Sequence, residues 1–106
     1  SCKHWPPGII DADFKEAVTS DAPILILSGE ADPITPPSYG ESITSTLPNA
    51  RHIVNPDQGH MQAPFGCMPV LLAKFISTAD AKNLNLECLE RLRVTPFFVD
   101  ANGPLP

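Results

Sequence analysis

Residues 25–37 read LILSGEADPITPP, and this stretch decides the fold of the chain. Its apolar half belongs to a short β-branched and leucine-rich run over residues 22–28, bounded by a proline and a glycine. Such continuous runs are typical of strands buried on both faces, as in parallel sheets. Asp32 then follows in a corner stiffened by Pro33. That aspartate could be ordinary turn chemistry, or it could be a working carboxylate at the mouth of a site.

Two segments downstream have the apolar spacing of helices. Residues 38–47 predict a helix, because Ser38-x-x-Glu41 has the form of a capping box directly after two prolines. Residues 66–77 predict a second helix with a buried stripe. The expected buried residues are Tyr39, Ile43 and Leu47 in the first helix and Leu71, Leu72, Phe75 and Ile76 in the second.

The order of the expected elements indicates an α/β protein. A strand, a helix, a strand and a helix joined by short connections predict a parallel pair with a right-handed crossover. Two parallel strands make a poor domain alone, so we expect more sheet in polypeptide that precedes Ser1. The whole chain (1–106) would be one segment with a lead-in (1–21), a core (22–78), and a short helix and tail (79–106). Within it we expect a short helix (13–18), strands (22–28, 50–55, 95–99), and helices (38–47, 66–77, 85–92), with Asn85 as the last N-cap.

Two polar side chains follow the two main strands. Asp32 comes four residues after the first strand and His60 five residues after the second. Adjacent parallel strands bring such loops together at the carboxyl edge of a sheet. A carboxylate that accepts the imidazole Nδ1–H fixes the tautomer and leaves Nε2 free to take a proton from a hydroxyl nucleophile. Pro33 and Gly29 would hold the aspartate loop, and Gly59 would let the backbone turn closely before the histidine.

Other readings of these polar residues stay open. Asp32, Asp57 and His60 could hold a metal ion, although His and carboxylates are sparse here and Asp57 fits a turn better. We expect no metal and no cofactor. His52 lies within the second strand and is expected to be a structural or exposed strand residue, and no partner is visible for His4.

Several segments resemble the C-terminal portion of secreted α/β-hydrolases, closest to tripeptidyl-aminopeptidase-like hydrolases, which are related to prolyl aminopeptidases. The resemblance covers residues 22–98, and the pair formed by the G-x-x-D-P-x-T-P-P segment and the later G-H turn is fairly specific. It implies that Asp32 is the acid and His60 the histidine of a catalytic triad. The segments are residues 23–37 (PILILSGEADPITPP), 47–54 (LPNARHIV), 58–60 (QGH) and 66–67 (GC).

The chain departs from that family at the nucleophile. No G-x-S-x-G elbow is present in the sequence. Ser38 stands in P-P-S-Y-G, which lacks the first glycine and follows the acid, and Ser28 has an isoleucine where that glycine should be. We therefore expect the chain to supply two thirds of a triad and to be inactive alone.

The resemblance also bears on the cysteines and on Glu30. Cys67 and Cys88 could be two buried thiols, but likeness to a secreted family favours a disulfide that would close a loop of about 20 residues and contribute ~3 kcal/mol. Cys2 would then pair outside this chain, and the protein would be exported. Glu30 is expected to be a solvated acid, or else a contact to the free amino terminus of a peptide substrate.

These features predict part of a serine hydrolase. The full protein would act on peptides or on related small amides or esters, with the N-terminal remainder of the same polypeptide as a partner. The alternative is a non-catalytic or self-associating module with a hydrolase-like fold. The net charge of −5 and the absence of a Lys/Arg cluster argue against nucleic-acid binding. No apolar run is long enough for a membrane span.

Overall fold

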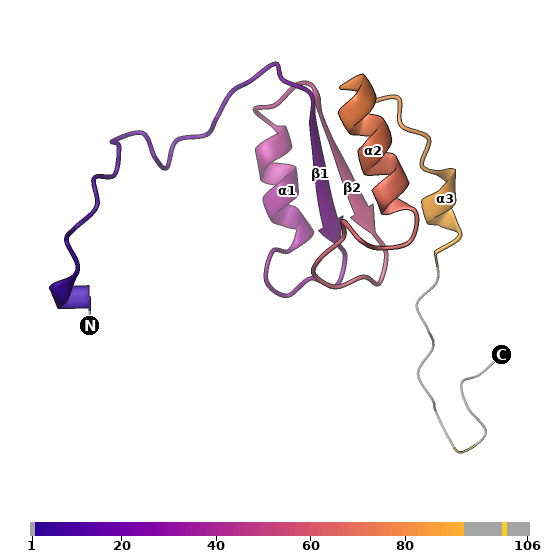
Figure 1. The fold of residues 1–106 in the computed structure, drawn as a ribbon, viewed down its shortest axis with the longest axis horizontal. Coiled ribbons are helices and arrows are strands. Elements are labelled where there is room, and N and C mark those ends of the chain that lie inside the picture. Colours follow the sequence, from indigo (N-terminus) through magenta and orange to yellow (C-terminus); the bar gives the residue numbers. More distant parts are fainter. Residues whose placement is uncertain (1, 93–100, 102–106) are drawn as a thin grey trace.

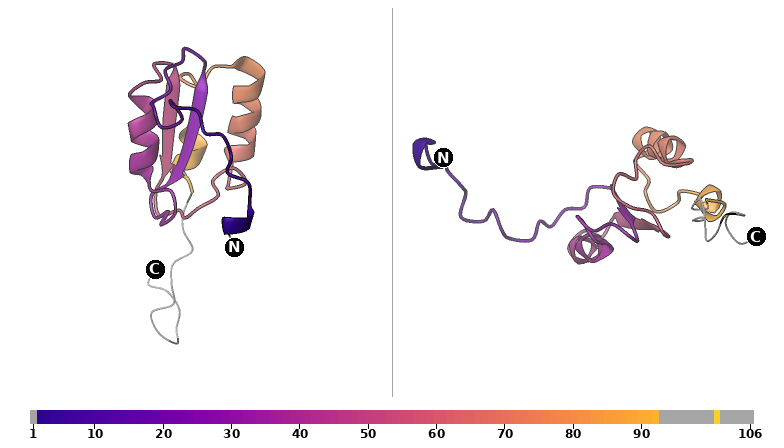
Figure 2. Two further views of the ribbon diagram at one scale, coloured as in Figure 1. Left: turned by 90° about the vertical axis from the view of Figure 1, so that its left-hand side faces the viewer. Right: turned by 90° about the horizontal axis from the view of Figure 1, so that it is seen from below.

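The computed structural model describes residues 2–92 and residue 101, and of Cys2 only the backbone. Figure 1 shows the elements in a three-layer arrangement, with α1 on one face of a small sheet and α2 on the other. The view from below in Figure 2 shows the sheet between these two helices. In chain order the elements are η1 (Cys2–His4), β1 (Ile24–Gly29), α1 (Pro37–Thr44), β2 (Ala50–Asn55), α2 (Met68–Thr78) and α3 (Glu87–Glu90).

The sheet is a parallel pair. β1 and β2 run side by side from Ile24 opposite Ala50 to Gly29 opposite Asn55. The helix α1 forms the crossover between them. This pairing confirms the α/β prediction, and it places the loops that follow both strands at one edge of the sheet.

The hydrophobic core lies between the sheet and α2. Its buried centre consists of Ile53, Met68 and Leu71, and Met68 is fully buried. Half-buried residues from β1, from α2 and from in and next to α3 surround this centre, among them Leu25, Leu27, Leu72, Leu86 and Leu89. Side chains alternate across a strand, so the odd-numbered positions of both strands face this core and the even-numbered ones face α1.

Helix α1 differs from its prediction in its cap and in its buried face. Its N-cap is Pro36, and no side chain caps it, so the predicted capping box of Ser38 and Glu41 is wrong. The fixed φ of proline begins the helix one residue earlier, at Pro37. The helix also ends at Thr44, three residues earlier than predicted, so Leu47 is buried but lies beyond the helix. The other two residues expected on the buried face, Tyr39 and Ile43, are 60% and 49% exposed.

The later helices are shorter than predicted. Helix α2 begins at Met68, and Ile76, expected in its buried stripe, is 78% exposed. Helix α3 covers four residues instead of eight, and its N-cap is Leu86. Asn85 still acts locally, because its side-chain oxygen accepts the backbone N–H of Glu87 at 2.9 Å. The predicted helix over residues 13–18 is absent, and residues 12–15 form turns instead. The predicted strand at 95–99 lies outside the described residues.

The first strand and the lead-in leave apolar surface uncovered. Residues 24–27 are only half-buried, because β1 has a single neighbouring strand among the described residues. The predicted burial of this first strand on both faces is therefore not reached among the described residues. The lead-in runs away from the sheet (Figures 1 and 2) and ends in hydrogen bonds from Thr46 and Asn49 to its last carbonyls. It exposes Trp5, Ile9, Ile10, Phe14 and Val18.

Candidate active site

A tight turn after β1 holds Asp32. The backbone N–H of Asp32 donates to the carbonyl of Gly29 at 3.1 Å, which closes the corner. One carboxylate oxygen, Oδ1, then accepts the backbone N–H groups of Ile34 (2.8 Å) and Thr35 (3.1 Å). The side chain is 4% exposed. An aspartate with two backbone donors ahead of it is held in one orientation by its own loop.

The turn after β2 holds His60, and it is tied to the end of β1. The backbone N–H of Glu30 donates to Asn55 and that of Ala31 donates to Gln58, both at 2.9 Å. Gln62 braces the turn from inside. Its amide nitrogen donates to the carbonyl of Gly59 at 2.5 Å, and its oxygen accepts the buried side chain of Asn55 at 2.6 Å.

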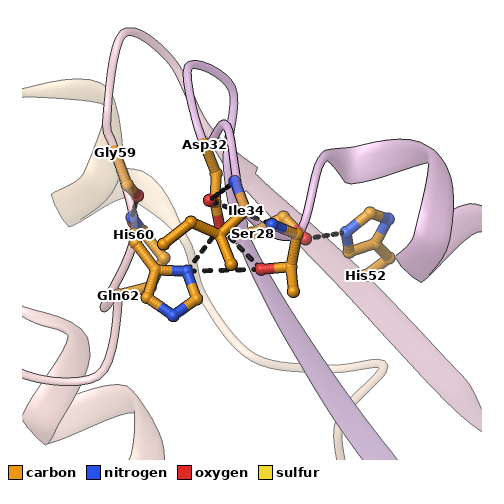
Figure 3. Close-up of polar contacts among 8 residues, drawn as sticks. Ser28, Asp32, Ile34, His52, Gly59, His60 and Gln62 are labelled. Carbon is orange, nitrogen blue, oxygen red and sulfur yellow. Dashed lines mark hydrogen bonds and ion pairs between the residues drawn. The ribbon is translucent and has the colours of Figure 1, made fainter.

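Asp32 and His60 meet at hydrogen-bonding distance. The Nδ1 atom of His60 lies 2.8 Å from Oδ2 of Asp32, and Figure 3 shows the ring turned so that its other nitrogen points away from the carboxylate. The histidine side chain is 44% exposed. Within the described part of the chain Nε2 has no hydrogen-bond partner. A buried acid thus holds a histidine whose free nitrogen faces outward.

The environment of Asp32 favours its charged form. Burial pushes the pKa of this carboxyl upward, but hydrogen bonds from His60, from the Thr35 hydroxyl and from the backbone N–H groups of Ile34 and Thr35 outweigh burial. The net result is a pKa well below the ordinary range of an aspartate. Asp32 is therefore a carboxylate at neutral pH, which is the form that can stabilise an imidazolium.

The close approach of the two loops requires Gly29 and does not require Gly59. A Cβ at Gly29 would collide with the carbonyl oxygens of Gln58 and Gly59. A Cβ at Gly59 would meet nothing within 4 Å. The sequence-based assignment of the close turn to Gly59 is therefore wrong, while Gly29 does hold the aspartate loop against the histidine turn.

The remaining predicted residues lie beside this pair without joining it. Glu30 is exposed, and its carboxylate accepts the backbone N–H of Asp57 at 3.0 Å, so it also ties the two loops together. Asp57 occupies a left-handed turn position with φ of 56°. His52 is structural: its Nε2 lies 2.8 Å from the Ser28 hydroxyl, and its ring packs against Gly40 of α1 (Figure 3 shows the Ser28 contact).

The structure joins Cys67 and Cys88 in a disulfide, with their Cα atoms 6.3 Å apart. The bond connects the N-cap of α2 to α3. Among residues 2–92 and 101, no cluster of three or more His, Cys, Asp or Glu side chains could hold a metal ion. No helix in that same part of the chain is long and apolar enough to cross a membrane.

Sequence reasoning missed Thr35 and Gln62 as site residues. The Thr35 hydroxyl donates to Oδ2 of Asp32 at 2.7 Å and lies 3.3 Å from Nδ1 of His60. The aspartate gave a partial signal, because an Asp side chain in a turn accepts backbone N–H groups of the residues that follow it, and this places Thr35 beside it. Gln62 gave no such signal, since its contact depends on how the turn folds back on β2.

The parallel pair, its flanking helices and this acid–histidine arrangement define an α/β-hydrolase segment. The sequence profile of the family described as "TAP-like protein" matches residues 1–88, which is most of the chain. The chain therefore belongs to the TAP-like family of α/β-hydrolases, as the resemblance implied.

Curated relatives match a shorter stretch of the chain. Two proteins named "Putative non-heme bromoperoxidase BpoC", from Mycobacterium tuberculosis strains CDC 1551 / Oshkosh and ATCC 25618 / H37Rv, are each 40% identical to the chain over 40 residues. The match covers 38% of this chain and 15% of each relative. No solved structure matches the chain significantly.

Proposed function

We propose that this chain supplies the acid and the histidine of a serine hydrolase whose nucleophile lies in polypeptide outside it. The observation that carries the proposal is the 2.8 Å contact between Nδ1 of His60 and Oδ2 of Asp32 at the carboxyl ends of two parallel strands. Membership of the TAP-like family supports a hydrolase.

The geometry suggests how these two residues would act. Asp32 keeps the proton on Nδ1, so Nε2 of His60 can take the proton from a serine hydroxyl as its oxygen attacks the substrate carbonyl. The imidazolium then gives that proton to the leaving amine or alcohol, and an acyl-enzyme forms. A water molecule repeats the sequence: it loses a proton to Nε2, attacks the acyl carbon and releases the serine. Asp32 stays ionised throughout and stabilises the imidazolium.

The arrangement of serines in the chain supports an external nucleophile. Ser28 is buried, and its hydroxyl bonds to His52. No serine hydroxyl within the described residues is hydrogen-bonded to His60. The serine would therefore approach the exposed Nε2 side of the ring, from outside these residues.

Peptides, or related small amides or esters, are the proposed substrates, as the resemblance to tripeptidyl-aminopeptidase-like hydrolases implies. Glu30 remains exposed near the mouth of the site, where it could also contact a substrate's amino terminus. The disulfide fits an exported protein, and export is part of the proposal.

The test is hydrolysis by the full-length protein that contains this chain. Chromogenic aminoacyl- and tripeptidyl-amides and simple acyl esters serve as substrates, and His60→Gln and Asp32→Asn are the variants. We expect the His60 variant to lose activity by at least 10³-fold and the Asp32 variant by a comparable factor. His52→Gln is the matched control and should keep most activity. Equal rates for wild type and His60→Gln would refute the proposal.

A non-catalytic module is the second candidate, and the exposed apolar side chains favour it. Ile34, Tyr39 and Ile43 lie exposed on or next to α1, and the lead-in exposes five more large apolar residues. Such surface would suit docking on another protein or on a second copy. An upstream G-x-S-x-G in the same reading frame would favour the enzyme, and a reading frame that begins near Ser1 would favour the module. Size-exclusion chromatography of the chain would reveal self-association.

A further inference from the structure

The hydroxyl of Thr35 lies beside the contact between the two members of the acid–histidine pair. It donates to Oδ2 of Asp32 at 2.7 Å, which is the same oxygen that His60 approaches at 2.8 Å. It also lies 3.3 Å from Nδ1 of His60. The three atoms therefore form a closed triangle. The Thr35 side chain is exposed and belongs to the aspartate loop, not to the core.

The protons of this triangle can be assigned from its donors and acceptors. A carboxylate only accepts, so both the threonine hydroxyl and Nδ1 donate toward Oδ2. The threonine proton is used in this bond, so its oxygen presents a lone pair toward Nδ1–H. If the ring instead carried its proton on Nε2, the lone pair of Nδ1 would face both Oδ2 and the threonine oxygen. Turning the hydroxyl toward Nδ1 would then leave Oδ2 without a donor.

We propose that Thr35 is a positioning residue that holds Oδ2 of Asp32 and the Nδ1–H of His60 in one geometry, because its hydroxyl donates to that oxygen and lies beside the ring nitrogen. The inference rests on the proposed function for its catalytic meaning, but its structural claim concerns only these three side chains. Thr35 acts on Oδ2, whereas the backbone N–H groups of Ile34 and Thr35 anchor Oδ1. Removal of the hydroxyl therefore leaves the carboxylate in place and changes only the side that faces the histidine.

The experiment uses the 106-residue chain labelled with ¹⁵N at histidine and with ¹³C at the aspartate carboxyl groups. The chain has three histidines, so the spectrum contains few ring-nitrogen signals. The signals that disappear in His60→Gln are those of His60. Thr35→Val removes the hydroxyl at nearly constant shape, and Thr35→Ser keeps it. Thr44→Val is the matched control, because the Thr44 hydroxyl bonds within α1 to the Glu41 carbonyl. Thr35→Ala serves as a second hydroxyl-free variant, and circular dichroism checks that each variant is folded.

The expected result has two parts. In wild type, Thr35→Ser and Thr44→Val, the ring nitrogens of His60 should report the Nδ1–H tautomer. In Thr35→Val and Thr35→Ala the Nδ1–H tautomer should persist, because Oδ2 still accepts that proton, but the Nδ1 shift should move from its wild-type value because the ring has lost its contact with the hydroxyl. The carboxyl signal of Asp32 should also titrate at higher pH in these two variants than in wild type. A purely structural role would lower stability without changing the Nδ1 shift or this titration, and that result would overturn the proposal.

A second arm separates this inference from the proposed function. In the full-length protein, Thr35→Val should lower kcat roughly tenfold to hundredfold and leave KM nearly unchanged, because the hydroxyl touches the catalytic pair and not the substrate. Thr35→Ser should restore most of the rate. A wild-type protein without hydrolysis would refute the proposed function, while the Nδ1 shift and the Asp32 titration would still decide the role of Thr35. If wild type hydrolyses the substrates and Thr35→Val has an unchanged kcat, the proposed role of Thr35 is wrong and the proposed function stands.

Discussion

The contact between the end of β1 and the histidine turn leads to a prediction about two glycines. In Gly29→Ala the new methyl group would collide with the carbonyl oxygens of Gln58 and Gly59. These are backbone atoms that cannot rotate away as a side chain can, so the turn that carries His60 must move. Overpacking of this kind costs about 1–3 kcal/mol. A gain of ~0.4–1 kcal/mol from the lower entropy of the unfolded chain offsets part of this cost.

The two ranges together give a net loss for Gly29→Ala of ~0–2.6 kcal/mol of unfolding free energy, and the collision with two backbone oxygens favours the upper half of this range. Gly59→Ala is the matched control, because its methyl group would enter open space and its φ lies outside the left-handed region. We expect it to be neutral or to stabilise the chain by up to ~1 kcal/mol. Urea unfolding followed by circular dichroism measures both, with the midpoint and slope reported for each variant.

A second readout connects the same substitution to the site. The displaced turn should lengthen the contact between Nδ1 of His60 and Asp32 in Gly29→Ala, and the ¹⁵N signals of the His60 ring should change. In Gly59→Ala these signals should stay close to those of wild type. Equal stability of the two variants, together with unchanged His60 signals in both, would refute the claim that Gly29 sets the position of the histidine turn.

Three further predictions concern stability. The pKa of Asp32 is lowered in the folded chain, so its stabilising contribution is complete above the ordinary aspartate pKa of about 3.9 and is lost as the pH falls below that value. The difference in unfolding free energy between wild type and Asp32→Asn should therefore shrink in acid. A constant difference between pH 6 and pH 2.5 would contradict this. Joint replacement of Cys67 and Cys88 by serine should lower the free energy of unfolding by ~3 kcal/mol, and identical urea midpoints with and without the bond would disprove it. Met68→Ala should cost ~2–5 kcal/mol because Met68 is fully buried, whereas Val70→Ala on the exposed face of α2 should change stability by less than ~0.5 kcal/mol; similar losses at the two positions would count against the assigned core.

The site could be anticipated because its position follows from local patterns. An apolar run that ends at Gly29 and a second strand that ends at Asn55 predict two parallel strands, and their carboxyl ends bring Asp32 and His60 together. The role of Thr35 was less visible. A common turn sets its backbone position, but the contact of its hydroxyl with Nδ1 of His60 depends on how the histidine loop packs beside it.

The errors arise where distant segments decide the outcome. Gly29 and Gly59 look alike in sequence, and only the register of the two loops determines which one meets a carbonyl. The exposed faces of α1 and α2 have a different cause. Ile43 and Ile76 have the spacing of buried residues, yet the described part of the chain offers them nothing to pack against. Their apolar character is consistent with a larger protein around this segment.

The central claim is that His60 and Asp32 activate a serine outside this chain. The most direct measurement is labelling of the full-length protein with a fluorophosphonate probe, followed by mass spectrometry of the labelled peptide. We predict stoichiometric labelling of a single serine outside residues 1–106 in wild type, and strongly slowed labelling in His60→Gln. Labelling of a serine within these 106 residues, or labelling at the wild-type rate in His60→Gln, would contradict the account.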